Sequence, residues 1–209
     1  MQASVIEEEA MLHFESFEPN AVFSALKTHG AVAVPMLTTS TRERLLNEAQ
    51  LFSYSDRSGK IGKAQVTQQF GAFTSFAPES DFLTLSRYLQ QTCLELGLVG
   101  ARFEPRLIFN EHVVQKYPAG SIGITPHIDS IRCRNMVVVC VLDGDGDFAI
   151  CDDRGGKNTQ VIPAPPGHVI FMAAIGFCGR TEQQFHFLHN IVGGRTTFGM
   201  RQILPREMR

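Results

Sequence analysis

Residues 117–129 read Tyr117-Pro-Ala-Gly-Ser-Ile-Gly-Ile-Thr-Pro-His127-Ile-Asp129 and end in a His-x-Asp pair. On an extended strand, residues i and i+2 point to the same face, so the imidazole of His127 and the carboxylate of Asp129 are placed to bind one ion together. Two histidines and one carboxylate on one face of an octahedral metal leave positions open for other ligands. The pair alone is a weak signal, and its interpretation depends on the rest of the chain.

The chain after residue 100, which contains this pair, alternates short strand-like segments with turns. The segments expected to form strands are residues 107–116, 123–128, 136–142, 148–151, 160–162, 169–173, 185–192 and 196–203. Residues 143–147 (Asp-Gly-Asp-Gly-Asp) and 163–167 (Pro-Ala-Pro-Pro-Gly) are typical turn sequences between them. Many short strands without intervening helices predict an antiparallel double-sheet fold such as a jelly roll.

The first hundred residues have a more helical pattern. We expect helices over residues 19–30, 40–52 and 82–97, the second opened by a capping box of Ser40 and Glu43, with a short strand at 31–35 and extended chain at 65–76. Residues 53–63 are polar and rich in turn-forming residues, which predicts a mobile loop and a substrate lid. The predicted class is α+β with a mainly β core: one domain, 1–209, in which residues 1–100 buttress a double-stranded β-helix formed by residues 101–209.

Composition limits the classes of partner. The 209 residues carry a formal net charge of −2 with a pI near 6.4, so no overall positive field attracts nucleic acid or an anionic membrane. The 5 cysteines are scattered without a Cys-x-x-Cys motif, a pattern that favours reduced thiols. Residues 1–9 are acidic where a signal peptide is basic, and no apolar run approaches the roughly 18 residues that span a bilayer. We therefore expect a cytoplasmic protein with no membrane contact.

A third metal ligand is expected from a strand near the C-terminus. Two histidines are available in residues 184–191, His186 and His189, and because they are three apart on a strand they point to opposite faces. Downstream, Arg195 and Arg201 are six apart and share a face of their strand. A guanidinium group is suited to bidentate binding of a carboxylate, so these arginines are candidates for an acidic ligand.

The order of these motifs resembles that of the Fe(II)/2-oxoglutarate-dependent oxygenases, and within them the AlkB-like branch. The matching segments are Gln115-Lys-Tyr117-Pro-Ala-Gly120, the His-x-Asp pair, Phe187-Leu-His189-Asn-Ile191 and the closing Arg195-x5-Arg201-Gln202. The resemblance covers most of the chain and is strongest over residues 109–202.

The resemblance implies a role for each matching residue. The implied Fe(II) ligands are His127, Asp129 and His189, with His186 as the open alternative to His189. The implied 2-oxoglutarate-binding residues are Arg195, Arg201, Tyr117 and Gln115, of which Arg195 pairs with the distal carboxylate and Arg201 lies near the metal-chelating end. The implied reaction consumes O2 and 2-oxoglutarate, releases succinate and CO2, and oxidises a bound substrate.

Two departures from the AlkB-like pattern bear on the substrate. Repair enzymes of that branch carry an acidic residue two positions after the metal-binding Asp, where this chain has Ile131. The chain also has no Trp to stack on a flipped base. We therefore predict a dioxygenase that oxidises, most simply by hydroxylation, a small molecule. The alternatives are an AlkB-type demethylase of nucleic acid or protein and a non-catalytic jelly roll that binds a metal or a sugar.

Overall fold

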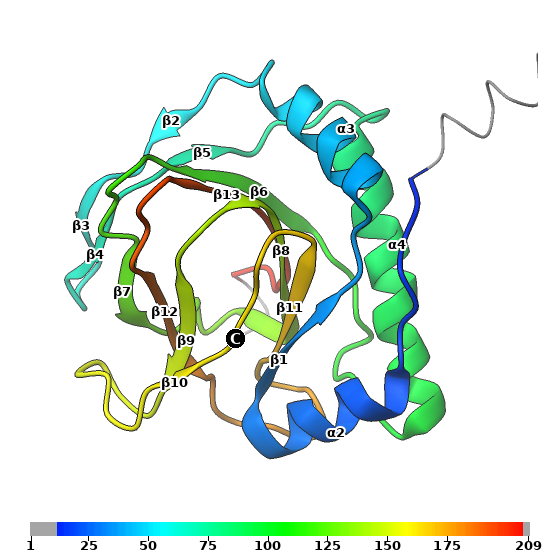
Figure 1. The fold of residues 1–209 in the computed structure, drawn as a ribbon. Coiled ribbons are helices and arrows are strands. Elements are labelled where there is room, and N and C mark those ends of the chain that lie inside the picture. The colour runs from blue at the N-terminus through cyan, green and yellow to red at the C-terminus, as the bar shows by residue number, and fades with distance from the viewer. Residues whose placement is uncertain (1–11, 207–209) are drawn as a thin grey trace, which may run out of the picture.

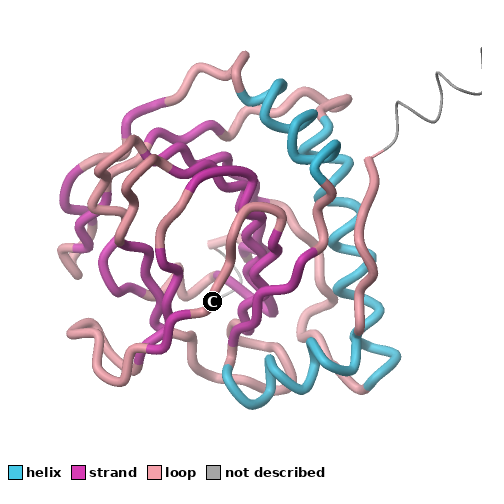
Figure 2. The backbone as a smooth tube through the Cα atoms, viewed as in Figure 1, coloured by secondary structure: helices cyan, strands magenta, loops and turns pink. Residues whose placement is uncertain are grey.

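The structure, a computed structural model, describes residues 12–206 as two antiparallel β-sheets with helices along one side (Figures 1 and 2). The larger sheet consists of β1 (Ala31–Pro35), β2 (Ser55–Asp56), β5 (Gly71–Phe73), β6 (Glu111–Tyr117), β8 (Cys133–Gly144), β11 (His168–Ala173) and β13 (Arg195–Ile203), in the order β1-β11-β8-β13-β6-β5-β2. The smaller sheet consists of β3 (Gly59–Ile61), β4 (Val66–Gln68), β7 (Ile124–His127), β9 (Asp147–Cys151), β10 (Gln160–Val161) and β12 (Phe185–His189), in the order β10-β9-β12-β7-β4-β3. The predicted jelly-roll core is confirmed, because the strands expected after residue 100 all form and join these two sheets.

The helices cover the outer face of the larger sheet (Figure 1). They are α2 (Pro19–His29), α3 (Thr39–Ala49), α4 (Asp81–Glu95) and the short 3-10 helix η1 (Leu96–Val99). Leu26, Leu45 and Leu89 are fully buried in one cluster with Val138 and Phe198 of the sheet. Burial of such side chains contributes about 1.5–3 kcal/mol each, so the helices are an integral layer of the domain.

A second apolar cluster fills the space between the two sheets. It joins Val137, Val141 and Ile170 of the larger sheet to Phe148 and Leu188 of the smaller one. Consecutive residues of β8 alternate between the two clusters, because neighbouring side chains on a strand point to opposite faces. The continuous apolar run of β8 is therefore explained by burial on both faces.

Some local expectations differ from the structure. Helix α3 is capped by Thr38, whose side chain accepts a hydrogen bond from the Thr41 backbone, and Ser40 lies inside the helix. The segment expected to be a mobile lid contains β2 and β3, which pair with the edges of opposite sheets. Residues 1–9, on which the expectation of no signal peptide rested, lie outside the described residues. None of the helices in residues 12–206 combines the length and the apolar character needed to cross a membrane.

Candidate active site

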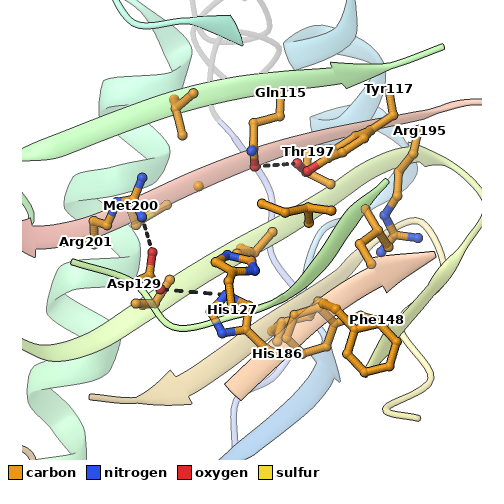
Figure 3. A pocket seen from close by; sticks show the side chains of 18 residues that line it. Gln115, Tyr117, His127, Asp129, Phe148, His186, Arg195, Thr197, Met200 and Arg201 are labelled. Atoms are coloured by element: carbon orange, nitrogen blue, oxygen red, sulfur yellow. Dashed lines mark hydrogen bonds and ion pairs between the residues drawn. The ribbon is translucent and has the colours of Figure 1, made fainter. Parts of the chain in front are cut away.

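The His-x-Asp pair and His186 meet between the two sheets (Figure 3). Strand β12 pairs with β7 so that His186 lies directly opposite His127, and their ring centroids are 4.3 Å apart. Asp129, just beyond the end of β7, places its Oδ2 3.7 Å from Nε2 of His186. The register shifts between His186 and Leu188, which marks a β-bulge in this pairing. The bulge lies beside Pro126 of β7, which has no backbone N–H to donate to a neighbouring strand.

Backbone carbonyl groups fix the orientation of both imidazoles. Nδ1 of His127 donates to the Thr125 carbonyl oxygen at 2.9 Å, and Nδ1 of His186 donates to the Gln184 carbonyl oxygen at 3.1 Å. Because a carbonyl only accepts, the proton of each neutral ring lies on Nδ1 and the lone pair lies on Nε2. Hydrogen bonding of the second ring nitrogen in this way is typical of metal-binding histidines.

The protonation states also suit a cation. Burial, assisted by the neighbouring His186, lowers the pKa of His127 to about 4, so its ring is neutral at physiological pH. Burial opposes ionisation of Asp129, but the charge of Arg201 and the two imidazoles outweigh it and hold the pKa of this carboxyl below its usual range. The neutral imidazole of His127, the ring of His186 and the carboxylate of Asp129 are therefore gathered at one point.

Arg201 connects this carboxylate to the strand beside it. Its Nη1 donates to Oδ1 of Asp129 and its Nε donates to Oε2 of Glu111, which lies opposite it on β6. The Oδ1 atom is thus held by protein, whereas Oδ2 faces His186. Arg201 therefore acts on Asp129 directly, and Glu111 acts on it through Arg201.

The donor set fits a divalent metal with open positions. Neighbouring ligands of an octahedral ion with bonds of about 2.1 Å lie about 3 Å apart, slightly closer than the 3.7 Å between His186 and Asp129. Within the described part of the chain, no three or more His, Cys, Asp or Glu side chains are spaced to hold a metal ion as they stand. A small inward movement of Asp129 or His186 would bring their ligand atoms to that spacing.

The structure does not bring His189 into this group. His189 lies opposite Asp147 on β9, its ring packs 5.0 Å from that of Phe187, and it does not line the cavity. Side chains alternate between the two faces along β12. His186 and Leu188 therefore point to the inner face, and His189 points to the other one. The structure therefore places the alternative, His186, beside His127 and Asp129, and places His189 outside this group.

A cavity of about 90 Å³ extends from these three side chains toward Arg195. The guanidinium group of Arg195 is held by the carbonyl oxygens of Asp145, Gly146 and Ala164, at 3.1, 3.0 and 3.3 Å. The residue is only 4% exposed, and its Nε–H is buried without a hydrogen-bond partner among residues 12–206. An unpaired donor on a buried cation is costly, so this group fits an anionic ligand inside the cavity.

Tyr117 and Gln115, the other two residues expected here, line the same cavity. Tyr117 lies opposite Arg195 in the β6–β13 pairing, and burial raises the pKa of its hydroxyl, which is therefore a neutral donor. Gln115 lies opposite Thr197, whose hydroxyl is 3.5 Å from its Oε1. The cavity thus has a cation and polar groups at one end and the imidazole–carboxylate group at the other (Figure 3).

Some residues that support the site were not identified from the sequence. The carbonyls that hold Arg195 come from the Asp-Gly-Asp-Gly-Asp turn and from the proline-rich turn, and Asp145 also caps the backbone N–H groups of Val192 and Gly193. The sequence marked both segments as turns, but no signal connected them to Arg195. Glu111 and Thr197 were likewise unassigned, since their roles depend on pairing between distant strands.

Comparison with known proteins supports the fold. No family model matches the sequence, and no curated protein matches it significantly. Among solved structures, a Pseudomonas putida prolyl-4-hydroxylase has a TM-score of 0.64 at 14% identity, covering 90% of this chain and 100% of that one. An oxidoreductase of the 2OG-Fe(II) oxygenase family from Burkholderia pseudomallei has a TM-score of 0.65 at 14% identity, with 93% and 96% covered. HygX from Streptomyces hygroscopicus, solved with nickel and 2-oxoglutarate, has a TM-score of 0.62 at 11% identity, with 91% and 89% covered. The chain shares the fold of these proteins.

Proposed function

We propose that this protein is an Fe(II)/2-oxoglutarate-dependent oxygenase that oxidises a small molecule and releases succinate and CO2. The observation that carries the proposal is the cavity that joins Arg195, a buried cation with an unpaired donor, to two imidazoles and an ionised carboxylate. The shared fold supports it, because proteins of that fold include 2-oxoglutarate-dependent oxygenases and one of them was solved with 2-oxoglutarate bound.

In this proposal His127, Asp129 and His186 hold Fe(II), which when bound supplies the activation of O2 that no amino-acid side chain provides. Arg195 binds the distal carboxylate of 2-oxoglutarate, and the buried hydroxyl of Tyr117 donates to the same group. Thr197 and Gln115 lie along the length of the co-substrate. The low exposure of these side chains keeps water away from the reacting atoms, which strengthens each electrostatic contact.

Arg201 has a different role from Arg195. It is paired with both Asp129 and Glu111, so its charge is already neutralised by protein. Its role here is to hold the ligand carboxylate in position, with Oδ2 directed toward His186. This arrangement matches the general rule that carboxylate ligands are themselves hydrogen-bonded by a second layer of groups.

The proposal is tested by adding Fe(II) and 2-oxoglutarate to the protein without oxygen. The chelate of 2-oxoglutarate on iron gives a weak visible absorption band, which we expect from the wild type and not from His127→Ala. A wild-type protein that binds neither metal nor 2-oxoglutarate would refute the proposal and favour a non-catalytic jelly roll. The AlkB-like assignment stays a prediction, and release of formaldehyde from methylated oligonucleotides would support it.

A further inference from the structure

A second, larger cavity of about 560 Å³ lies beside the first. The two share three lining residues, Val113, Gln115 and Arg201, so the larger cavity adjoins the end of the site where Asp129 lies. Its volume is within the range of cavities that bind small organic ligands. We call it the outer groove.

The outer groove lies where the chain crosses twice between the sheets. Strands β2 and β5 belong to the larger sheet, and β3 and β4 belong to the smaller one, so residues 57–58 and 69–70 form the crossings. The Arg57 backbone N–H donates to the Phe70 carbonyl at 2.9 Å, and Nε2 of the buried Gln68 donates to the Arg57 carbonyl at 2.6 Å. The backbone of Arg57 is therefore fixed, although its side chain is exposed.

Among the described residues that line the outer groove, one charged side chain has no partner, and it is a cation. Its ionisable lining residues are Arg57, Glu111, His112 and Arg201. Glu111 is paired with Arg201. Nε2 of His112 is hydrogen-bonded to Ser86 at 2.7 Å, and burial lowers the pKa of this imidazole, so the ring is neutral. Within residues 12–206 the guanidinium group of Arg57 makes no hydrogen bond or ion pair, so its positive charge is free to pair with a ligand.

The rest of the lining suits a small carbon skeleton. Phe70, Ala72 and Val113 form an apolar wall, and Phe70 packs against Tyr117 with ring centroids 5.1 Å apart. Phe70 is only 7% exposed, so little of its ring is open for a nucleobase to stack on. A single free cation beside an apolar wall is also too little charge for a nucleic-acid backbone.

We propose that the outer groove is the substrate site and that its substrate is a small organic anion, bound by Arg57 through its acidic group and by Phe70 and Val113 through its apolar part. This inference rests on the proposed function, since it assigns the substrate class of the same site. Arg57 lines the outer groove but not the first cavity, whereas Arg201 lines both. A ligand whose acidic group pairs with Arg57 would therefore extend its carbon chain toward Arg201 and Asp129.

The test uses protein loaded with Mn(II) and saturating 2-oxoglutarate, with binding measured by calorimetry. The probes are octanoate, octyl phosphate and octanamide, which share a carbon chain and differ in the head group. We expect the anions to bind about tenfold more tightly than the amide, the size of effect that one charge-assisted pair gives. Preference for octanoate over octyl phosphate, or the reverse, identifies the acidic group.

Arg57→Gln should abolish the difference between anion and amide, and Arg57→Lys should keep part of it. Lys60→Gln is the matched control, because it removes a cation from β3, next to Arg57, that does not line the outer groove. Equal binding of octanoate and octanamide, no effect of Arg57→Gln, or no binding of any probe would overturn the inference. Since 2-oxoglutarate binding is measured first, its absence would refute the proposed function instead.

Discussion

Replacing Arg195 with Met tests the co-substrate end of the site most directly. Methionine retains the apolar part of the side chain and removes the guanidinium group, so a 2-oxoglutarate carboxylate would lose its charged partner. Hydrogen bonds to charged groups contribute about 1.5–3 kcal/mol, which corresponds to a rise in the Kd of 2-oxoglutarate of roughly 10- to 150-fold. The affinity for Mn(II) should change by less than about threefold, because Arg195 lies at the opposite end of the cavity (Figure 3).

The same substitution has a cost in stability. The carbonyl oxygens of Asp145, Gly146 and Ala164 would each lose a donor. At about 1 kcal/mol for each lost hydrogen bond, the free energy of unfolding should fall by about 3 kcal/mol. Arg195→Lys retains the charge without the planar fork, and its affinity for 2-oxoglutarate should lie between those of wild type and Arg195→Met.

The assay is calorimetric titration of 2-oxoglutarate into the Mn(II)-loaded protein, together with urea unfolding. Arg42→Met is a matched control, because Arg42 also donates from Nη1 to a backbone carbonyl, that of Leu142, but does not line the cavity. The control should lower stability and leave the 2-oxoglutarate affinity unchanged. A folded Arg195→Met protein that binds 2-oxoglutarate as tightly as the wild type would refute this account of the site.

Three further predictions concern other groups of the site. His186→Ala should weaken Mn(II) binding by about 100-fold or more, whereas His189→Ala should leave the affinity within about twofold of the wild type. Binding is followed by the EPR signal of free Mn(II). The opposite order of effects would restore His189 as the ligand. Glu111→Gln should lower the Mn(II) affinity about 10-fold, because Arg201 exchanges a carboxylate acceptor for a weaker, neutral amide oxygen, and an unchanged affinity would exclude this positioning role. Burial holds the pKa of His112 below its usual value of about 6.5. As the pH drops below 6.5, the unfolded chain therefore binds a proton at this ring more readily than the folded protein does. The free energy of unfolding should fall in that pH range. The urea midpoint should therefore fall less between pH 7.5 and 5.5 in His112→Gln than in the wild type, and equal falls would show that another group is responsible.

The β half of the fold was predictable from local sequence, because its strands are apolar segments bounded by turn residues. The capping of α3 shows where such local reasoning fails. Thr38 and Ser40 both carry a hydroxyl suited to an N-cap, and the structure uses Thr38. Thr38 also donates to the carbonyl oxygen of His13, 25 residues earlier in the chain, at 3.1 Å, a contact that the pattern around residue 40 does not contain.

The expectation of an irregular loop over residues 53–63 differs from the structure for a related reason. A polar, glycine-containing segment is typical of a mobile loop, and residues 53–63 have that composition. Two short strands form within it because the edge strands β5 and β4 offer unpaired backbone groups, and β2 and β3 pair with them. The result places Arg57 on a fixed crossing between the sheets, so it has the rigidity that a binding residue needs.

The choice between the two histidines shows what kind of information the sequence lacked. His-x-Asp and the two arginines are spaced by even numbers of residues, so the face they share follows from the chain itself. The third position depends instead on the register of β12 against β7, where a shift of one residue moves every side chain to the other face. That register includes a bulge next to Pro126 and is held by the pairing of β12 with β9 on its other side. The three side chains proposed to bind the metal are therefore brought together by three strands, and the local His-x-Asp motif places only two of them.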